Sequence, residues 1–198
     1  MVNHYELTGF NSSGVFEEKN KIIIGNTNRD YKNYINSLRY RYNKKNPYLP
    51  NYVINKDGDI YEIISSDMYS KYMDDEQISK ESVIILLENL GWLKKNPLNN
   101  TFTNWIGDIY KKEVFEKRWR NEIYWDIYSQ KQIESLAKLI VNICEKHNIP
   151  KKMVESNVLF DEAKLFKGIT SKSNYYIYHK DVNPSFDFKL LKKFIDNE

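Results

Sequence analysis

Cysteine and histidine are scarce in this chain of 198 residues. Cys144 is the only cysteine, which excludes an internal disulfide and a cysteine-based zinc cluster. The three histidines, His4, His147 and His179, are too few for most metal-ligand spacings. Apolar runs fall far short of the roughly 20 residues that cross a bilayer. The N-terminus lacks a basic start followed by an apolar stretch. We therefore expect neither a membrane span nor a signal peptide.

Alanine and arginine are also scarce, with 2 Ala and 5 Arg against 25 Lys, 23 Asn and 16 Tyr. Lys, Asn, Tyr and Ile have A/T-rich codons, so this bias indicates an A/T-rich genome rather than a polybasic binding surface. The net charge of +3 arises from 30 basic and 27 acidic residues. Because the two signs nearly balance, we expect no nucleic-acid partner.

What the chain does contain is a succession of short structural patterns. Hydrophobic residues make up 41% of it, which suits one globular domain over residues 1–198. The patterns predict a strand at 21–24, a helix capped by Asp30, a hairpin of 52–54 and 60–64 around Asp57-Gly58, a buried strand at 83–87, a helix over 130–147 and a last helix capped by Asp187. This order predicts an α/β fold with a mixed central β-sheet and helices on both faces.

Two segments stand apart from this pattern. Residues 1–19 form an N-terminal segment, and residues 92–128 carry all four tryptophans with little periodicity. We interpret 92–128 as a Trp-rich insertion packed on the body. Trp105, Trp119 and Trp125 are expected to be mostly buried, because exposed tryptophans are an aggregation liability.

Four motifs over residues 20–196 share their order with a known family. They are Ile22-Ile23-Ile24-Gly25-Asn26-Thr27, the hairpin Asn51-Tyr52-Val53-Ile54 with Asp57-Gly58-Asp59-Ile60-Tyr61, Ile84-Ile85-Leu86-Leu87-Glu88-Asn89, and His179-Lys180-Asp181-Val182-Asn183-Pro184-Ser185-Phe186. The set resembles the zinc-dependent N-acetylmuramoyl-L-alanine amidases, whose fold is shared by peptidoglycan recognition proteins and phage endolysins.

The same resemblance indicates that the family's chemical groups are missing. Gly25 stands at the first zinc-binding His, and Ser156, Ser171 or Ser173 at the second. Only Asp181 matches a ligand, as a vestigial position. The family's acidic catalytic residue falls on Leu86, its hairpin His on Asn51 and its helper Lys on His179. One carboxylate cannot hold a catalytic zinc, which needs three protein ligands, so we expect no cofactor.

The resulting hypothesis is a degenerate, catalytically inactive amidase-like domain that acts as a binding or structural protein. Its partner is another protein or a peptidoglycan fragment. The expected cleft comprises Gly25, Asn26, Asn51, Tyr52, Glu88, Ser156, Asn157, Ser171 and Ser173. The A/T-rich coding and endolysin-like motifs favour a bacteriophage gene, with a cytoplasmic or virion-associated product. The alternative is an active cell-wall amidase that holds zinc through rearranged ligands such as His4, Glu88 or Asp181.

Overall fold

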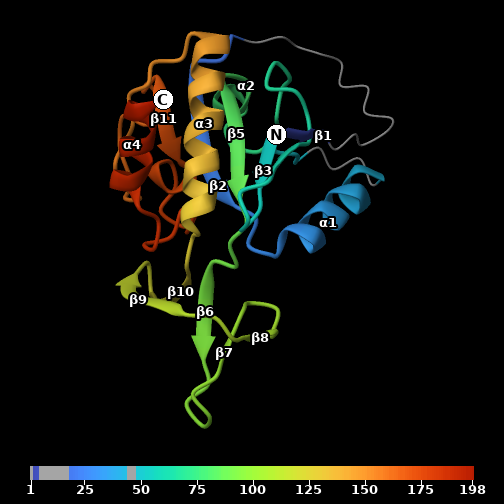
Figure 1. Ribbon diagram of the computed structural model, residues 1–198, viewed down its shortest axis with the longest axis vertical. Coiled ribbons are helices and arrows are strands. Elements are labelled where there is room, and N and C mark those ends of the chain that lie inside the picture. The colour runs from blue at the N-terminus through green and yellow to red at the C-terminus, as the bar shows by residue number, and fades with distance from the viewer. Residues whose placement is uncertain (1, 5–17, 44–47) are drawn as a thin grey trace.

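The computed structural model describes residues 2–4, 18–43 and 48–198, and this part of the chain forms two β-sheets (Figure 1). The larger sheet is mixed, because β4 runs antiparallel to β3 whereas the other neighbouring strands are parallel. Its spatial order is β1 (Val2–His4), β4 (Ile60–Glu62), β3 (Tyr52–Ile54), β5 (Ser82–Leu87), β2 (Lys21–Asn26) and β11 (Gly168–Ser171). Of the predicted N-terminal segment 1–19, residues 1 and 5–17 lie outside the described residues.

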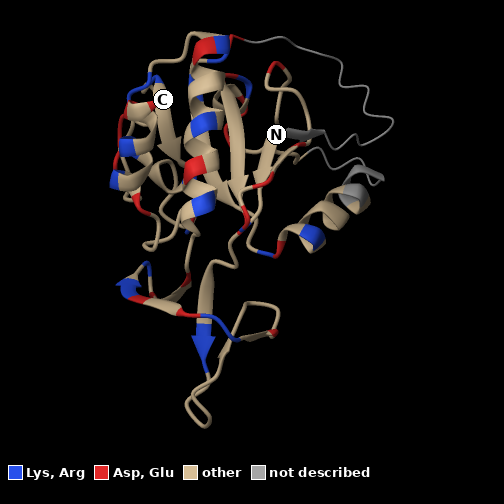
Figure 2. Cartoon of the chain, viewed as in Figure 1, with Lys and Arg blue, Asp and Glu red and all other residues tan. Residues whose placement is uncertain are grey.

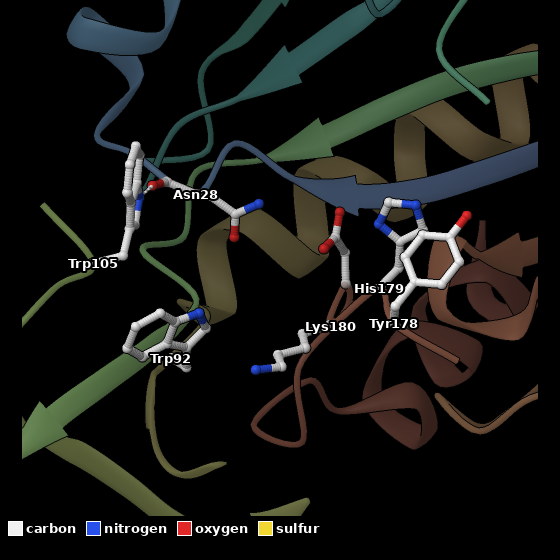
Figure 3. A pocket seen from close by; sticks show the side chains of 7 residues that line it. Asn28, Trp92, Trp105, Tyr178, His179 and Lys180 are labelled. Carbon is white, nitrogen blue, oxygen red and sulfur yellow. Dashed lines mark hydrogen bonds between the residues drawn. The ribbon is translucent and has the colours of Figure 1, made fainter. Parts of the chain in front are cut away.

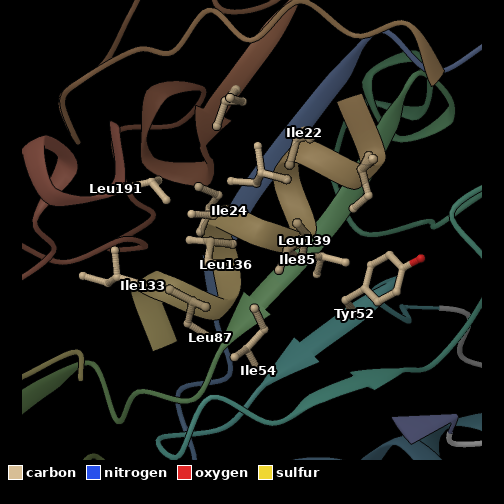
Figure 4. Packing of buried hydrophobic residues seen from close by; sticks show 14 of the residues in the cluster. Ile22, Ile24, Tyr52, Ile54, Ile85, Leu87, Ile133, Leu136, Leu139 and Leu191 are labelled. Carbon is tan, nitrogen blue, oxygen red and sulfur yellow. The ribbon is translucent and has the colours of Figure 1, made fainter. Parts of the chain in front are cut away.

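The central strands β2 and β5 are buried on both faces of this sheet. Successive side chains of a strand point to opposite faces, so each apolar run supplies two cores. Ile24 and Ile85 pack in the core beneath α3 (Gln130–His147) and α4 (Phe188–Asn197), as Figure 4 shows. Ile23 and Leu86 pack in the core beneath α1 (Tyr31–Asn43) and α2 (Glu76–Lys80). The predicted mixed α/β fold with helices on both faces is confirmed.

The ends of the helices follow local sequence rules. Ser129 and Gln132 form a capping box at the start of α3, and Asn148 ends that helix in a left-handed conformation with φ of 55°. The Asp187 carboxylate accepts the Leu190 N–H at 2.9 Å and caps α4. These short-range bonds explain why both helices could be predicted from sequence.

Replacing Ile85 by Val is expected to lower the free energy of unfolding by about 0.5–1.5 kcal/mol, because it removes one methylene from a closely packed core. Ile85 is 0% exposed. Ile177 is 71% exposed, so Ile177→Val is the matched control and should change stability by less than about 0.5 kcal/mol. Urea unfolding followed by circular dichroism measures both. Equal losses in the two variants would contradict the assigned core.

The smaller sheet is made by the Trp-rich segment and projects from the body (Figure 1). Its strands are, in spatial order, β8 (Ile109–Tyr110), β7 (Phe102–Thr103), β6 (Trp92–Lys95), β10 (Glu122–Asp126) and β9 (Val114–Trp119). The expectation that its tryptophans are mostly buried is right for Trp125, which is 0% exposed, and wrong for Trp105, which is 43% exposed. Trp105 lies in a loop that reaches back toward the body rather than in a core.

Charged residues of both signs are interspersed along the helices and strands (Figure 2). On α3, the exposed positions carry both signs, with Lys131, Lys138 and Lys146 beside Glu145. This is the arrangement of a solvated surface rather than of a phosphate-binding stripe. Within the described residues, no helix combines the length and the apolar character needed to cross a membrane.

Candidate functional site

The position of the expected first zinc ligand lies near the end of β2, in the middle of the larger sheet. Gly25 pairs in register with Leu86 of β5. A Cβ atom placed on Gly25 would lie 2.9 Å from Leu86 Cδ2 and 3.3 Å from Asp181 Oδ2. The Leu86 methyl group thus occupies the space that a side chain at Gly25 would enter. The fold therefore brings together Gly25, Leu86 and Asp181, which the sequence resemblance had assigned to one centre.

Asp181 is held in this centre by protein groups. The residue is 5% exposed. Its Oδ2 accepts the Asn26 N–H at 3.4 Å, and its carbonyl accepts the Ser173 N–H at 2.6 Å. Burial lowers the pKa of both Lys172 and Arg120, and the negative charge of Asp181 opposes that lowering in each. Asp181 therefore accepts hydrogen bonds from backbone N–H groups and balances the positive charge of nearby cations.

The serine candidates for the second ligand are committed to local structure. Ser171 Oγ lies 2.8 Å from Ser173 Oγ and donates to Asn174 Oδ1 at 2.8 Å, and both serines are fully buried. Ser156 contributes its carbonyl, which accepts from Asn174 Nδ2 at 2.9 Å. Asn157 Nδ2 donates to a backbone carbonyl of the C-terminal segment at 3.3 Å. These contacts shape the 171–174 turn beside Asp181.

Asn26 and Tyr52 were expected to line a cleft with Gly25, and the structure places both away from it. Each lies on the face of the sheet opposite to Gly25, because neighbouring residues of a strand alternate. Tyr52 packs in the core beneath α3. Asn26 Oδ1 accepts a short hydrogen bond from the hydroxyl of Tyr128, the residue just before the α3 cap.

Asn51 and Glu88 also have structural partners. Asn51 is 0% exposed, and its Oδ1 accepts the Ile84 N–H at 2.8 Å while its amide donates to the Ser65 carbonyl at 2.8 Å. Glu88 Oε2 accepts the backbone N–H of Lys56 at 2.9 Å. The Asn51 side chain thus links the start of β3 to β5. Its hydrogen bonds explain why a polar group can be buried at this position.

The donors around Asp181 do not fit a catalytic zinc. Such a site requires three protein ligands, drawn from His, Cys, Asp or Glu, and one open position. Gly25 has no side chain, Leu86 is apolar, and the hydroxyls of Ser171 and Ser173 are bonded to each other. Among the described residues, no group of three or more His, Cys, Asp and Glu side chains could hold a metal ion. Of His4, only the backbone is described.

A hollow of about 440 Å³ opens above this centre, between the two sheets (Figure 3). Trp92 of β6 and Trp105 of the loop between β7 and β8 form one side, and residues of the C-terminal segment form the other. The lining residues are Asn28, Trp92, Trp105, Tyr178, His179, Lys180 and Asp181. Of the residues predicted from sequence, the hollow includes His179 and Asp181. We name it the Asp181 hollow.

His179 lies in this hollow as a neutral base at pH 7. Burial lowers its pKa, and the neighbouring Lys172 ammonium lowers it further. Its Nε2 is 3.7 Å from Asp74 Oδ2 and has no hydrogen-bond partner among the described residues. The Tyr178 hydroxyl donates to Asp74 at 2.6 Å, which raises the pKa of Tyr178 to about 12. Because His179 Nε2 is buried, the Asp181 hollow presents a ligand mainly with aromatic surface, from Trp92, Trp105 and Tyr178.

Sequence analysis missed Trp92, Trp105 and Lys180 as lining residues. The two tryptophans had been assigned to packing, and nothing in their spacing indicates that they face one hollow. Lys180 Nζ lies 5.5 Å from the Trp92 ring centroid, and the Arg29 guanidinium lies 5.2 Å from that of Trp105. The only available signal was the concentration of all four tryptophans in one segment.

Comparison with known proteins agrees with this architecture. A family model described as N-acetylmuramoyl-L-alanine amidase matches residues 17–181. The match covers most of the chain, which therefore belongs to the N-acetylmuramoyl-L-alanine amidase family. No curated protein sequence matches the chain.

Several solved structures share the fold. The N-acetylmuramoyl-L-alanine amidase LysC from Clostridium intestinale URNW is 12% identical, with a TM-score of 0.60 over 99% of this chain and 97% of LysC. AmiD from E. coli, solved with the substrate anhydro-N-acetylmuramic acid-L-Ala-D-gamma-Glu-L-Lys, is 13% identical, with a TM-score of 0.59 over 92% of this chain and 60% of AmiD. PGRP-SA from Apis mellifera is 14% identical, with a TM-score of 0.51 over 98% of this chain and 93% of PGRP-SA. At such identities these likenesses establish the fold, and function must be argued from the site.

Proposed function

We propose that this chain is a non-hydrolysing member of the amidase family that binds a peptidoglycan fragment in the Asp181 hollow. One observation carries the proposal. A hollow of about 440 Å³ lies over the centre, whereas the centre itself holds Gly25, Leu86 and one carboxylate. The chain thus has a hollow that can hold a ligand and lacks the groups that would activate water.

The size and lining of the hollow support a small ligand over a protein partner. Ligand pockets commonly measure about 300–1,000 Å³ and combine aromatic surface with a few polar groups. The Asp181 hollow has both, through Trp92 and Trp105 on one side and Lys180 and His179 on the other. A stable protein interface needs roughly 800 Å² from each partner. AmiD, which shares the fold, was solved with a muropeptide.

The A/T-rich composition supports a further part of the proposal, an origin in a bacteriophage genome. In that setting a binding domain would act on cell-wall fragments or within a virion. The composition concerns the coding DNA and is independent of the site chemistry.

Binding can be tested by isothermal titration with a soluble disaccharide–tetrapeptide muropeptide. We expect saturable binding by the intact chain, and Trp92→Ala should weaken it about tenfold, the equivalent of roughly 1.4 kcal/mol from a lost aromatic contact. Tyr48→Ala is the control, because Tyr48 is a 41% exposed aromatic residue outside the hollow.

Two results would contradict the proposal. Absence of binding by the intact chain would exclude the ligand class. Release of L-alanine amino groups from peptidoglycan, abolished by a chelator, would instead establish the active amidase with rearranged ligands.

A further inference from the structure

The turn that joins β9 to β10 contacts one wall of the Asp181 hollow. Arg120, in this turn, donates from Nη1 to the Tyr176 carbonyl at 2.9 Å and from Nη2 to the Ser173 carbonyl at 2.8 Å. Its Cζ atom lies 4.4 Å from the centroid of the Trp119 ring. The rigid fork of a guanidinium suits two acceptors that are held at fixed positions. Arg120 therefore fixes the smaller sheet to the backbone of the C-terminal segment.

A second contact lies at the far end of the same wall. Lys180 Nζ is 2.6 Å from Oε1 of Glu122, and the two side chains are 28% and 25% exposed. The lining residues Tyr178 and His179 lie between the two contacts in the sequence (Figure 3). The β9–β10 turn therefore holds this stretch of the wall at both of its ends.

The conformation of the turn indicates that Arg120 is present for its side chain. Arg120 and Asn121 are the two residues between β9 and β10, and both have positive φ, of 46° and 68°. Such two-residue turns favour Asn and Gly, because a β-carbon is strained at positive φ. Arginine is also scarce, with 5 in the chain against 25 Lys. The contacts of the side chain explain why this residue is tolerated in a strained position.

Residues 176–180, which we name the wall loop, are held differently by the body of the protein. The Tyr178 hydroxyl donates to the Asp74 carboxylate at 2.6 Å, and the Asp75 N–H donates to the Tyr176 hydroxyl at 3.2 Å. Both contacts reach the ends of long side chains, and Tyr178 is 63% exposed. The turn, in contrast, binds a backbone carbonyl of the wall loop. The position of the loop backbone therefore depends on the turn.

We infer that Arg120 and Glu122 form a latch that positions the wall loop and thereby sets the shape of the Asp181 hollow. When these contacts break, the smaller sheet stays attached through Asp126, whose side chain is 3% exposed and lies 3.0 Å from Lys56 Nζ. The wall loop then loses the support of its backbone, and the hollow changes shape on that side only. This inference goes beyond the proposed function, because it concerns the hollow whichever ligand it takes.

A matched pair of glycine substitutions tests the latch. Arg120→Gly removes the guanidinium and suits the positive φ of that position, so the turn should be retained. Asn121→Gly relieves the same kind of backbone strain and leaves the guanidinium in place. Hydrogen–deuterium exchange of the wall-loop amides is measured by mass spectrometry. We expect Arg120→Gly to accelerate it about tenfold, because two bonds from a charged donor are lost, and Asn121→Gly to leave it unchanged.

Two further readouts separate a local latch from general damage. Exchange of the α3 amides should be unchanged in both variants, because the core beneath α3 does not include the turn. The disaccharide–tetrapeptide should bind Arg120→Gly about tenfold more weakly in isothermal titration, since the ligand must then order the wall loop, and should bind Asn121→Gly as it binds the unmodified chain.

The outcomes distinguish the latch from the proposed function. Unchanged wall-loop exchange in Arg120→Gly would overturn the latch and leave the binding proposal standing. Equal acceleration in the two glycine variants would also overturn it, because the turn and not the guanidinium would then be responsible. Faster wall-loop exchange in Arg120→Gly alone, without muropeptide binding by the intact chain, would support the latch and exclude the proposed function.

Discussion

The purified chain is expected to contain no stoichiometric zinc and to leave the bond between the muramoyl lactyl group and L-alanine intact, even with zinc added. The reason is the donor set. Among the residues that the structure describes, Asp181 is the one carboxylate at the centre, beside Gly25 and Leu86. Without a bound metal, the pKa of water is not lowered toward neutrality, so water is a poor nucleophile at neutral pH. The expected effect is complete loss of the family's reaction.

Restoring one histidine should not reverse this result. In Gly25→His, the new Cβ would lie 2.9 Å from Leu86 Cδ2, so the Leu86 side chain would have to move. Even then the ion would have two ligands instead of three. Elemental analysis and an amidase assay on purified peptidoglycan test both proteins. One zinc per chain in the unmodified protein, or turnover abolished by Asp181→Ala, would refute the expectation.

Asp126→Ala is expected to lower the free energy of unfolding by about 3–5 kcal/mol, the cost of leaving a buried ionic partner unpaired. The Asp126 side chain is 3% exposed and lies 3.0 Å from Lys56 Nζ. Asp126 Oδ1 accepts from the Tyr110 hydroxyl and Oδ2 from the Leu90 N–H, each at 2.8 Å. Burial lowers the pKa of Lys56, and Asp126 opposes that lowering. Removing the carboxylate therefore leaves a poorly solvated ammonium and two unmet donors.

The control for this substitution is Asp161→Ala, because Asp161 is exposed. We expect its effect to stay within about 0.5 kcal/mol. Urea unfolding at pH 7, followed by both tryptophan fluorescence and circular dichroism, measures the two variants. If Asp126→Ala lowers the free energy of unfolding by less than about 1 kcal/mol, the ion pair with Lys56 is not a buried interaction that links the two sheets.

The body of the fold was accessible from sequence because its signals are local. The apolar runs at β2 and β5 are each long enough for a strand buried on both faces. The Asp57-Gly58 turn sits in the Asn55–Asp59 loop, where Asn55 Oδ1 accepts two backbone N–H groups. The caps of α3 and α4 depend on residues within three positions of each other. Contacts between residues this close in sequence leave a recognisable sequence pattern that does not depend on the rest of the chain.

The smaller sheet was not predicted, because its short strands lack a clear alternation of buried and exposed residues. Asp126 illustrates the difficulty. Its carbonyl accepts hydrogen bonds from Asn89, Asn183 and Ser185, residues that come from two separate parts of the chain, each distant from Asp126 in sequence. A sequence records the polar residue types, and only folding brings these partners to one carbonyl.

The sequence by itself determined the element order, the family resemblance and the absence of zinc donors at the resembling positions. These conclusions depend on residue identity, because no packing can give Gly25 a side chain or Leu86 a carboxylate. The tertiary structure alone decided that Trp92, Trp105 and Lys180 share a hollow with Asp181. Those residues belong to distant segments, and their proximity is set by how the two sheets dock, which no short-range pattern encodes.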